Sequence, residues 1–441
     1  MARIPATARQ GILFPAWPPP DQAAMFALLG QLERSQWLAA ETLRRFQFRQ
    51  AERLLAHAAR TVPFYGDRLP KDGPTPENWL DIPLLTRRDI QDAGGDLRST
   101  RSPKDHGGTE EISPTGSMGA PIRVLATAAS QVFFRALNLR FHLWHGRDFA
   151  AKTASIRPPP ARPAKGRPSW APGYLTGPLV RFDISRPVAD QLRWLVDEDP
   201  DYLLTFPSNL AALLRESERS GLRPRALRQV SCMAELLEPE LRRLCESHWR
   251  IPVSDAYSAQ EVGMIALQCP EADGYHVQAE ALMVEVLDHN GAPAASGDAG
   301  RVVVTDLKNF AMPLIRYEIS DYAVEGEACG CGRGLPVLER VMGRKRNMLR
   351  LPGGGEMWPS YPAEIFFAIA PVRQIQLVQT GPQAIRVTLA VDAHLSADQE
   401  RKLTDALHQR LHHPFEIDFH YVDAIARAAG GKYEDFRCEI E

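Results

Sequence analysis

The chain of 441 residues is long enough for two or three domains, and its 44% hydrophobic and 24% charged residues are typical of a globular protein. A formal net charge of −2 gives no electrostatic reason to expect binding to nucleic acid or to an anionic membrane. The chain lacks a signal-peptide pattern and any apolar run of the roughly 18 residues that a membrane span needs, and its six cysteines do not make a disulfide scaffold, so we expect a cytoplasmic protein.

The N-terminal third begins with a helical pattern. Apolar residues recur at helical spacing from about residue 29 to residue 60, which predicts one long amphipathic helix. A shorter helix is expected to begin within the segment 81–90 (DIPLLTRRDI). The Gly- and Ser-rich segment 111–126 lies between two short strand-like runs, and the proline-rich stretch 157–173 is predicted to be an exposed loop.

The middle of the chain alternates helical and strand-like segments. Between about 187 and 250, helical runs alternate with short apolar strands, a pattern typical of α/β layers, and a mainly β region follows. Towards the C-terminus the pattern becomes compact α+β, with Ser396 and Gln399 forming a capping box at the start of a helix. The sequence therefore predicts an α/β protein with two domains, residues 1–342 and 343–441.

Two segments have the composition of nucleotide-binding loops. In residues 115–121 (TGSMGAP), glycines allow backbone N–H groups to approach an anion and hydroxyls add further donors; a Gly/Ser hairpin turn is the alternative. Residues 255–261 (DAYSAQE) follow a predicted strand, where a carboxylate can hold Mg²⁺ and Tyr257 offers a flat face; a solvated turn is the alternative.

Three further segments contain charged residues that could contact a ligand. In residues 316–321 (RYEISD) an aspartate follows a strand and could accept ribose hydroxyls, and in residues 343–348 (GRKRNM) an arginine offers a bidentate donor. Surface salt bridges are the alternative for both. In residues 430–433 (GGKY) a lysine lies on a Gly-Gly turn, although most lysines near a terminus have no special role.

Together, and in this order, the five segments resemble the motifs of the adenylate-forming superfamily, within it the phenylacetate-CoA ligase and CapK branch. TGSMGAP is similar to the Ser-Gly-Thr-Thr-Gly-x-Pro phosphate loop, and Tyr257 begins a segment similar to Tyr-Gly-x-Ser/Thr-Glu. Residues 311–321 (AMPLIRYEISD) closely resemble Ala-Met-Pro-x-Ile-Arg-Tyr-x-x-x-Asp. The segment 343–348 is similar to the Gly-Arg-x-Asp-Asp-Met hinge, and Lys432 to the lysine of the C-terminal catalytic Gly-Lys. The resemblance covers roughly residues 30–441.

The resemblance implies a large N-terminal domain of layered sheets and helices, which carries the ATP and acid sites, and a small mobile α+β C-terminal domain. It implies three catalytic residues: Lys432, Glu261 and Arg344. It implies seven residues that bind the nucleotide: Thr115, Gly116, Ser117, Gly119, Asp255, Tyr257 and Asp321.

By the same resemblance, each residue has an expected partner. The loop 115–119 wraps the phosphates, and Glu261 holds Mg²⁺. Asp255 and Tyr257 are expected to flank adenine, and Asp321 is expected to accept hydrogen bonds from the ribose hydroxyls.

Arg344 is expected beside the nucleotide, and Lys432 is expected to reach the acyl phosphate. The implied chemistry is attack of a carboxylate on the α-phosphorus with loss of pyrophosphate, stabilised by positioned cations. Rotation of the small domain would then present a thiol to the acyl-adenylate.

The sequence departs from the family pattern at four positions. Met118 replaces a hydroxyl in the phosphate loop, and Ser258 stands where the family usually has glycine. Arg346 and Asn347 occupy the paired aspartate positions of the hinge, which bears on domain rotation and the second half-reaction.

A separate group of residues has the chemistry of a metal centre. Cys269, His276, Cys329 and Cys331 form the tight Cys/His clusters of the sequence, and three thiolates with one imidazole suit a structural, tetrahedral zinc ion. Their spacing is not that of a zinc finger, so sequence alone leaves a non-metal role open. The branch resembled often carries such cysteines around a Cys-Gly-Arg segment, which favours zinc.

The leading hypothesis is an acid–CoA ligase that uses ATP, Mg²⁺ and coenzyme A on an aryl or arylacetic acid, by resemblance. A second hypothesis keeps the adenylation and transfers the acyl group to an amine, a hydroxyl or a carrier protein. A third is a nucleotide-binding protein without turnover. We expect a small carboxylic acid, ATP and a thiol as partners, and no nucleic acid or membrane; a homodimer stays open. Phe206 and Pro207 are candidates for the acid pocket.

Overall fold

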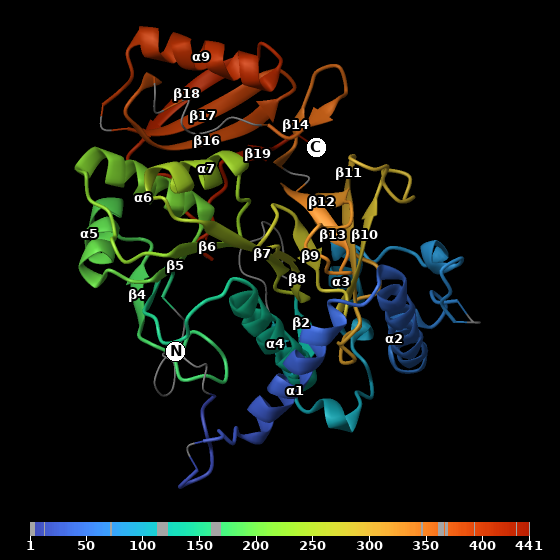
Figure 1. Cartoon of the computed structure of the whole chain (residues 1–441). Coiled ribbons are helices and arrows are strands. Elements are labelled where there is room, and N and C mark those ends of the chain that lie inside the picture. Colours follow the sequence, from blue (N-terminus) through green and yellow to red (C-terminus); the bar gives the residue numbers. More distant parts are fainter. Residues whose placement is uncertain are drawn as a thin grey trace.

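The structure is a computed structural model that describes most of the chain. The described residues are 5–12, 14–70, 73–112, 122–159, 169–344, 347–359, 366, 369–391, 393–428 and 430–440. They form a mixed α/β fold with one large sheet and a smaller C-terminal sheet (Figure 1).

The main sheet has eleven strands in the order β10-β11-β12-β13-β9-β8-β7-β6-β5-β3-β4. Its parallel half is built from β3 (Thr153–Arg157), β4 (Leu179–Asp183), β5 (Tyr202–Thr205), β6 (Gln229–Met233) and β7 (Val253–Ala259). Helices α5 (Val188–Glu198), α6 (Pro207–Ser220) and α7 (Pro239–His248) alternate with these strands. Their apolar faces share one core with the strands, which confirms the predicted α/β layering.

The other half of the main sheet is antiparallel. Its strands are β8 (Gly263–Gln268), β9 (Tyr275–Val277), β10 (Leu282–Leu287), β11 (Ala299–Asp306), β12 (Tyr317–Gly326) and β13 (Val337–Arg344). Helices α1 (Pro20–Ser35), α2 (Ala40–Thr61), α3 (Arg87–Ala93) and α4 (Ala128–Trp144) accompany it. These helices and strands contribute to one hydrophobic cluster, the largest in the described part of the chain.

The C-terminal unit has its own sheet and its own core. Its four strands lie in the order β18-β17-β16-β19: β16 (Val372–Gly381), β17 (Ala384–Val391), β18 (Glu416–Val422) and β19 (Phe436–Cys438). A small hairpin, β14 (Leu349–Arg350) and β15 (Glu356–Met357), precedes it. Helix α9 (Ala397–Leu411) begins with the predicted Ser396–Gln399 capping box and covers the face of the sheet remote from α6 and α7 (Figure 1).

The prediction of one long helix over residues 29–60 is wrong. The chain ends α1 at Ser35 and begins α2 at Ala40. The turn between them receives a loop from far along the chain: the Gly334 amide donates to the Gln36 carbonyl (2.8 Å), and a Cβ on Gly334 would lie only 1.8 Å from the Leu38 oxygen. Tertiary contact therefore overrides helical periodicity here.

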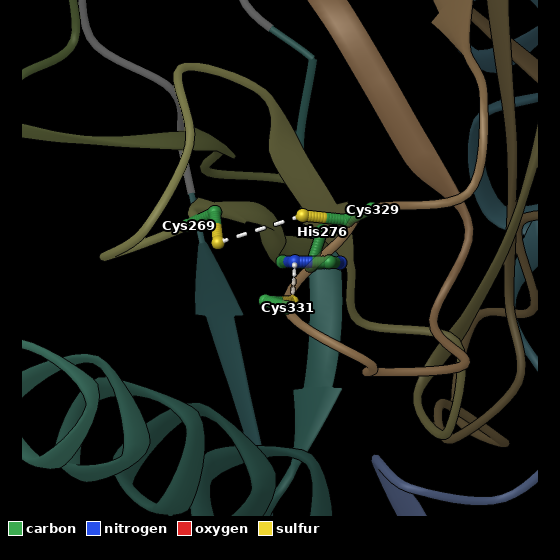
Figure 2. Close-up of side chains that lie close together, drawn as sticks. All are labelled: Cys269, His276, Cys329 and Cys331. Carbon is green, nitrogen blue, oxygen red and sulfur yellow. Dashed lines mark hydrogen bonds between the residues drawn. The ribbon is translucent and has the colours of Figure 1, made fainter.

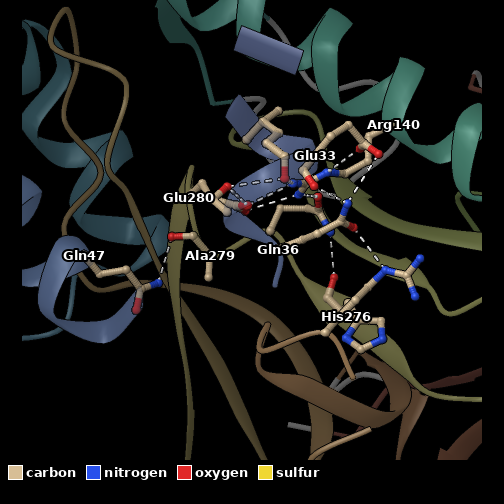
Figure 3. Close-up of polar contacts among 11 residues, drawn as sticks. Glu33, Gln36, Gln47, Arg140, His276, Ala279 and Glu280 are labelled. Atoms are coloured by element: carbon tan, nitrogen blue, oxygen red, sulfur yellow. Dashed lines mark hydrogen bonds and ion pairs between the residues drawn. The ribbon is translucent and has the colours of Figure 1, made fainter. Parts of the chain in front are cut away.

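A fully buried arginine joins the N-terminal helix to the main sheet (Figure 3). Arg140 of α4 donates to Gln278 Oε1 and Glu280 Oε1, each at 2.9 Å, and to the carbonyl of Leu32 near the end of α1. Glu33 lies 3.6 Å from the same guanidinium. A charge at this depth is tolerable only because carboxylates and amides surround it.

The proline-rich stretch 157–173 is less exposed than predicted where it is described. Arg157 is the last residue of β3, Ala171 is fully buried, and Trp170 Nε1 donates to the Ala151 carbonyl at 3.1 Å. Residues 160–168 lie outside the described part of the chain. Within the described residues, no helix combines the length and the apolar character needed to span a bilayer.

Candidate active site and metal centre

A large open cleft of about 2920 Å³ lies between the main sheet and the C-terminal unit. Its walls include the end of β7 and the turn after it, the end of β13, and the loop before β19. Six of the residues predicted from sequence line this cleft: Asp255, Tyr257, Glu261, Asp321, Arg344 and Lys432. Parallel strands collect ligand-binding groups at their carboxyl ends, which is where β7 delivers its residues.

Tyr257, Asp321 and Arg344 are joined by a hydrogen bond and an ion pair. The Tyr257 hydroxyl donates to Asp321 Oδ2 at 2.8 Å, and Arg344 Nε lies 3.6 Å from Asp321 Oδ1. Asp321 and Arg344 face each other across the β12–β13 ladder, so sheet register sets their separation. Burial, and then the Asp321 charge, raise the pKa of Tyr257 well above its ordinary value, so the phenol remains a donor.

Glu261 lies in the tight turn between β7 and β8 and is half-buried. Its carboxylate has neither a hydrogen-bond nor an ion-pair partner among the described residues, although it lies near enough to influence the charge of Lys432. A half-buried carboxylate without a fixed partner is available to a hard divalent cation such as Mg²⁺.

Asp255 lies two residues before Tyr257 in β7, so the two side chains are on the same face of the sheet. Its Oδ2 accepts a hydrogen bond of 2.8 Å from the Tyr275 hydroxyl, whereas its Oδ1 is buried without a partner among the described residues. Burial raises the pKa of Asp255 to about 6. An orphaned buried acceptor is costly, and a ligand N–H in the cleft would satisfy it.

Lys432 reaches the cleft from the C-terminal unit and is half-buried. Burial, followed by the positive charge of Arg344, lowers the pKa of Lys432, while Asp321, Glu235 and Glu261 act in the opposite direction. The preceding Gly431 has φ +80°, and a Cβ there would lie 2.5 Å from the Pro158 ring. Only glycine fits this position, because both the backbone conformation and the contact exclude a side chain.

Several predicted positions lie elsewhere. The loop residues Thr115, Gly116, Ser117 and Gly119, together with Met118 and Arg346, are outside the described residues. The predicted runs beside the loop are confirmed as an antiparallel pair, β1 (Thr109–Ile112) and β2 (Val124–Thr127).

Arg316 has a structural position, and of the two acid-pocket candidates one lies in the core and the other at the cleft. Arg316 is buried and pairs through two nitrogens with Glu285 (3.0 and 3.2 Å), so its salt bridge is a buried one and not the surface salt bridge given as the alternative. Phe206 is part of the core beneath Gly431, and Pro207 lines the cleft.

The four residues predicted to bind zinc come together (Figure 2). One ligand atom from each of Cys269, His276, Cys329 and Cys331 lies within 4.8 Å of all the others. The Cys269 and Cys329 sulfurs are 3.8 Å apart, and Cys331 Sγ is 3.3 Å from His276 Nε2. Zinc–sulfur bonds of about 2.3 Å at tetrahedral angles place sulfurs about 3.8 Å apart, whereas a disulfide needs about 2.05 Å, so the set fits a metal ion.

The surroundings of this Cys/His cluster hold it firmly. Burial lowers the pKa of His276 to about 4, which keeps its imidazole neutral, as a ligand must be. Trp144 packs edge-on against His276 with ring centroids 5.7 Å apart. The Arg333 guanidinium lies over both Trp144 (4.6 Å) and Trp37 (4.8 Å), so the cysteine loop is bound to α4 and to the turn after α1.

Two residues at the cleft were missed from sequence: Glu235, after the end of β6, and Arg427, five residues before Lys432. They form an ion pair of 3.6 Å between the large part of the chain and the C-terminal unit. Glu235 follows the carboxyl end of a parallel strand, which is the signal that could have found it. Arg427 has no comparable signal.

Comparisons with known proteins give one family match within the C-terminal unit and relatives over longer stretches of the chain. Residues 352–436 match the family described as the CapK C-terminal domain. Phenylacetate-coenzyme A ligase from Aromatoleum evansii is 27% identical over 51% of this chain and 52% of its own length. The enzyme of the same name from Thermus thermophilus is 24% identical over 76% of this chain and 77% of its own length. These matches relate the chain to phenylacetate-coenzyme A ligases and, in its C-terminal unit, to the CapK C-terminal domain.

Phenylacetate-CoA ligases are thus distant homologues within the adenylate-forming superfamily, and the chain matches about half the length of the first of them. The fold agrees with solved structures of the superfamily. The crystal structure of 2-hydroxyisobutyryl-CoA ligase in the postadenylation state, in complex with R3-HIB-AMP, matches with a TM-score of 0.70 at 16% identity over 92% of both chains. The same ligase in the thioesterification state, in complex with 2-HIB-AMP and CoA, matches with a TM-score of 0.57 at 18% identity, again over 92% of both chains.

Proposed function

We propose that the protein is an AMP-forming acid–thiol ligase, which activates a carboxylic acid with ATP and transfers the acyl group to coenzyme A. The observation that carries this proposal is the convergence on one cleft of Tyr257, Glu261, Asp321 and Arg344 from the main sheet with Lys432 from the C-terminal unit. A nucleotide-binding protein without turnover would have no need of a lysine delivered to the same place.

In the first half-reaction, a carboxylate oxygen of the acid attacks the α-phosphorus of ATP, and the bond to the bridging oxygen breaks as pyrophosphate leaves. Asp321 offers a carboxylate to the ribose hydroxyls, held in position by Tyr257 and Arg344. The Lys432 ammonium would stabilise the negative charge that builds between the carboxylate and the α-phosphate. Asp255 Oδ1 would accept from the adenine amino group.

In the second half-reaction, a thiol sulfur attacks the acyl carbon of the adenylate, AMP leaves with the bonding electrons, and the thiol proton passes to solvent. Phenylacetate-CoA ligases among the relatives favour coenzyme A as the thiol and an aryl or arylacetic acid as the substrate. Amines, hydroxyls and carrier-protein thiols remain the alternative acceptors that the same adenylate could serve.

Two metal ions fit this scheme. Glu261 would hold Mg²⁺, which would offset charge on the phosphate oxygens. Cys269, His276, Cys329 and Cys331 would hold a structural zinc ion, because all four ligand positions of a tetrahedral ion are then filled by protein and none is left for a substrate.

Pyrophosphate exchange tests the proposal. Purified protein is incubated with ATP, Mg²⁺, labelled pyrophosphate and each of a panel of aryl, arylacetic and aliphatic acids. Exchange that depends on one class of acid supports acid activation and identifies the class before any acceptor is known. No exchange with any acid, from protein that still binds ATP, would reject the proposal.

A further inference from the structure

Glu235 is fixed by the large part of the chain and turned toward the C-terminal unit. Its Oε2 accepts a hydrogen bond of 3.0 Å from the Ser208 amide in the first turn of α6, a position where the helix dipole also favours a negative charge. Its side chain is 8% exposed. Burial raises the pKa of Glu235, while the Ser208 and Tyr433 amides and Arg427 favour its ionised form.

The remaining oxygen of Glu235 is used entirely by the loop that carries Lys432. The Tyr433 amide donates to Glu235 Oε1, and Arg427 Nη1 lies 3.6 Å from the same oxygen. Arg427 also donates to Ser208 Oγ (2.8 Å), and within its own segment to the Gly431 carbonyl (3.1 Å). One arginine therefore closes the turn around the lysine and attaches that turn to α6.

The contact surface beneath this turn is closely fitted. Gly431 lies against Pro158, and a Cβ at Gly431 would also come within 3.2 Å of Phe206. The Arg427 side chain is 18% exposed, so its ion pair with Glu235 is formed largely out of water. Removing one partner of such a pair leaves a buried charge without compensation.

Similarity to two solved states of one ligase indicates in which step of the reaction these contacts form. The 2-hydroxyisobutyryl-CoA ligase matches this chain with a TM-score of 0.70 in its postadenylation state and 0.57 in its thioesterification state, over 92% of both chains in each case. The chain thus resembles the postadenylation structure more than the thioesterification structure, which supports assigning these contacts to the acid-activation step.

We infer that Glu235 and Arg427 form a latch, which positions the Lys432 loop for acid activation and must open before acyl transfer. The inference rests on the proposed function. Glu235 and Arg427 are positioning residues, because they act on the reaction through the place they give to Lys432. The latch explains why a half-buried ammonium is held beside Asp321 and Arg344 although burial disfavours its charge.

The test compares two half-reactions in three arginine variants. Arg427→Met removes the charge and roughly keeps the length of the side chain. Arg427→Lys keeps the positive charge but lacks the planar guanidinium with its several N–H donors. Arg401→Met is the matched control, because Arg401 lies on the exposed face of α9 and, within the described part of the chain, pairs only with the exposed Asp398. We expect Arg427→Met to lower the rate of pyrophosphate exchange about 10- to 100-fold at saturating ATP, the scale of a misplaced catalytic group.

Acyl transfer from a preformed acyl-adenylate should stay within about twofold of the parent in Arg427→Met, since the latch is open in that step. Arg427→Lys should recover part of the exchange rate, and Arg401→Met should match the parent in both assays. Equal losses of both half-reactions in Arg427→Met, or an unchanged exchange rate, would overturn the inference.

Hydrogen exchange decides the same question without turnover. In the parent, the Tyr433 amide is protected by Glu235. Its deuterium uptake should be at least about tenfold faster in Arg427→Met and in Glu235→Gln, and unchanged in Arg401→Met. Protection that is the same in all four proteins would overturn the latch. If the parent shows no pyrophosphate exchange with any acid, the proposed function fails, and the uptake data still support or overturn the latch.

Discussion

Tyr257 and Asp321, 64 residues apart in the sequence, are joined by a hydrogen bond of 2.8 Å from phenol to carboxylate. Their strands, β7 and β12, are separated in the sheet by β8, β9 and β13. In a flat sheet four strand spacings of about 4.8 Å would hold them roughly 19 Å apart. The antiparallel half of the sheet therefore curls strongly, and this curl brings the Asp321 carboxylate opposite the tyrosine.

Loss of zinc should affect stability more than chemistry. We expect purified protein to contain about one zinc ion per chain, and Cys329→Ser to lose it and to lower the melting temperature by several degrees, because the ion joins loops distant in sequence. Elemental analysis and thermal unfolding measure both effects. Cys438→Ser is the control, since Cys438 lies outside the cluster. Metal-free parent protein with an unchanged Cys329→Ser melting temperature would contradict the assignment.

Glu261→Gln should impair adenylation through magnesium. The amide keeps the shape of the side chain and removes its negative charge, so we expect pyrophosphate exchange to fall about 10²-fold or more. Excess Mg²⁺ should restore part of it if the carboxylate mainly supplies affinity. A titration of exchange rate against Mg²⁺ checks this, with the exposed Glu52→Gln as control. Near-normal exchange at limiting Mg²⁺ would show that another group holds the ion.

Lys432→Ala should separate the two half-reactions. Loss of the ammonium should lower the adenylation rate about 10²–10³-fold, roughly 3–4 kcal/mol of transition-state stabilisation, with little change in ATP binding. Conversion of a preformed acyl-adenylate to thioester should remain close to the parent rate. Equal loss in both steps would mean that the lysine serves one fixed conformation.

Gly431→Ala tests the fit of the turn that carries the lysine. A methyl group there meets the Pro158 ring at 2.5 Å on a backbone with φ +80°. The left-handed conformation alone costs a non-glycine residue about 1 kcal/mol, so the turn should shift and adenylation should fall about tenfold or more. Gly381→Ala, where the added methyl makes only an ordinary 3.6 Å contact, is the control for pyrophosphate-exchange assays. Equal activity of the two variants would refute the close fit.

Asp255 should make stability depend on pH. Burial raises its pKa to about 6, against about 4 in an unfolded chain, so between these values the folded protein binds more protons than the unfolded one. Its contribution to the free energy of unfolding therefore falls by about 3 kcal/mol as the pH rises from about 4 to above 6. Asp255→Asn should remove this fall, whereas the exposed Asp105→Asn should not. Urea unfolding at pH 4.5 and pH 7.5 measures the difference.

The sequence predicted those features that depend on local pattern or on an ordered set of motifs. The alternation of helices and strands, the Ser396 capping box and the gathering of the cysteines with His276 are all present. The break between α1 and α2 could not be predicted, because Gly334, about 300 residues later, provides the contact that turns the chain. The residue-by-residue roles in catalysis and the domain boundary at residue 343 stay predictions.

The ion pair between Glu235 and Arg427 shows a second limit of sequence reasoning. Each residue alone has the pattern of an ordinary surface charge, and only the docking of the C-terminal unit on α6 makes the pair meaningful. Periodicity reports which face of an element is buried, but it does not report which element from elsewhere covers that face. A residue that acts between two separately folded sheets is therefore found only when both are in place.

The buried Arg140 has a consequence for how the chain is made. Its carboxylate partner Glu280 follows 140 residues later, and Ser35 at the end of α1 also bonds to Glu280, 245 residues away. At ribosomal rates of about 5–20 residues per second, α1 and α4 leave the ribosome many seconds before the groups that complete their core. During that time Leu32 and Glu33 of α1 can contact the guanidinium, but Gln278 and Glu280 are still missing, so α1 and α4 cannot bury it completely. A nascent chain arrested before residue 280 should therefore recruit chaperones, and one arrested well beyond it should not.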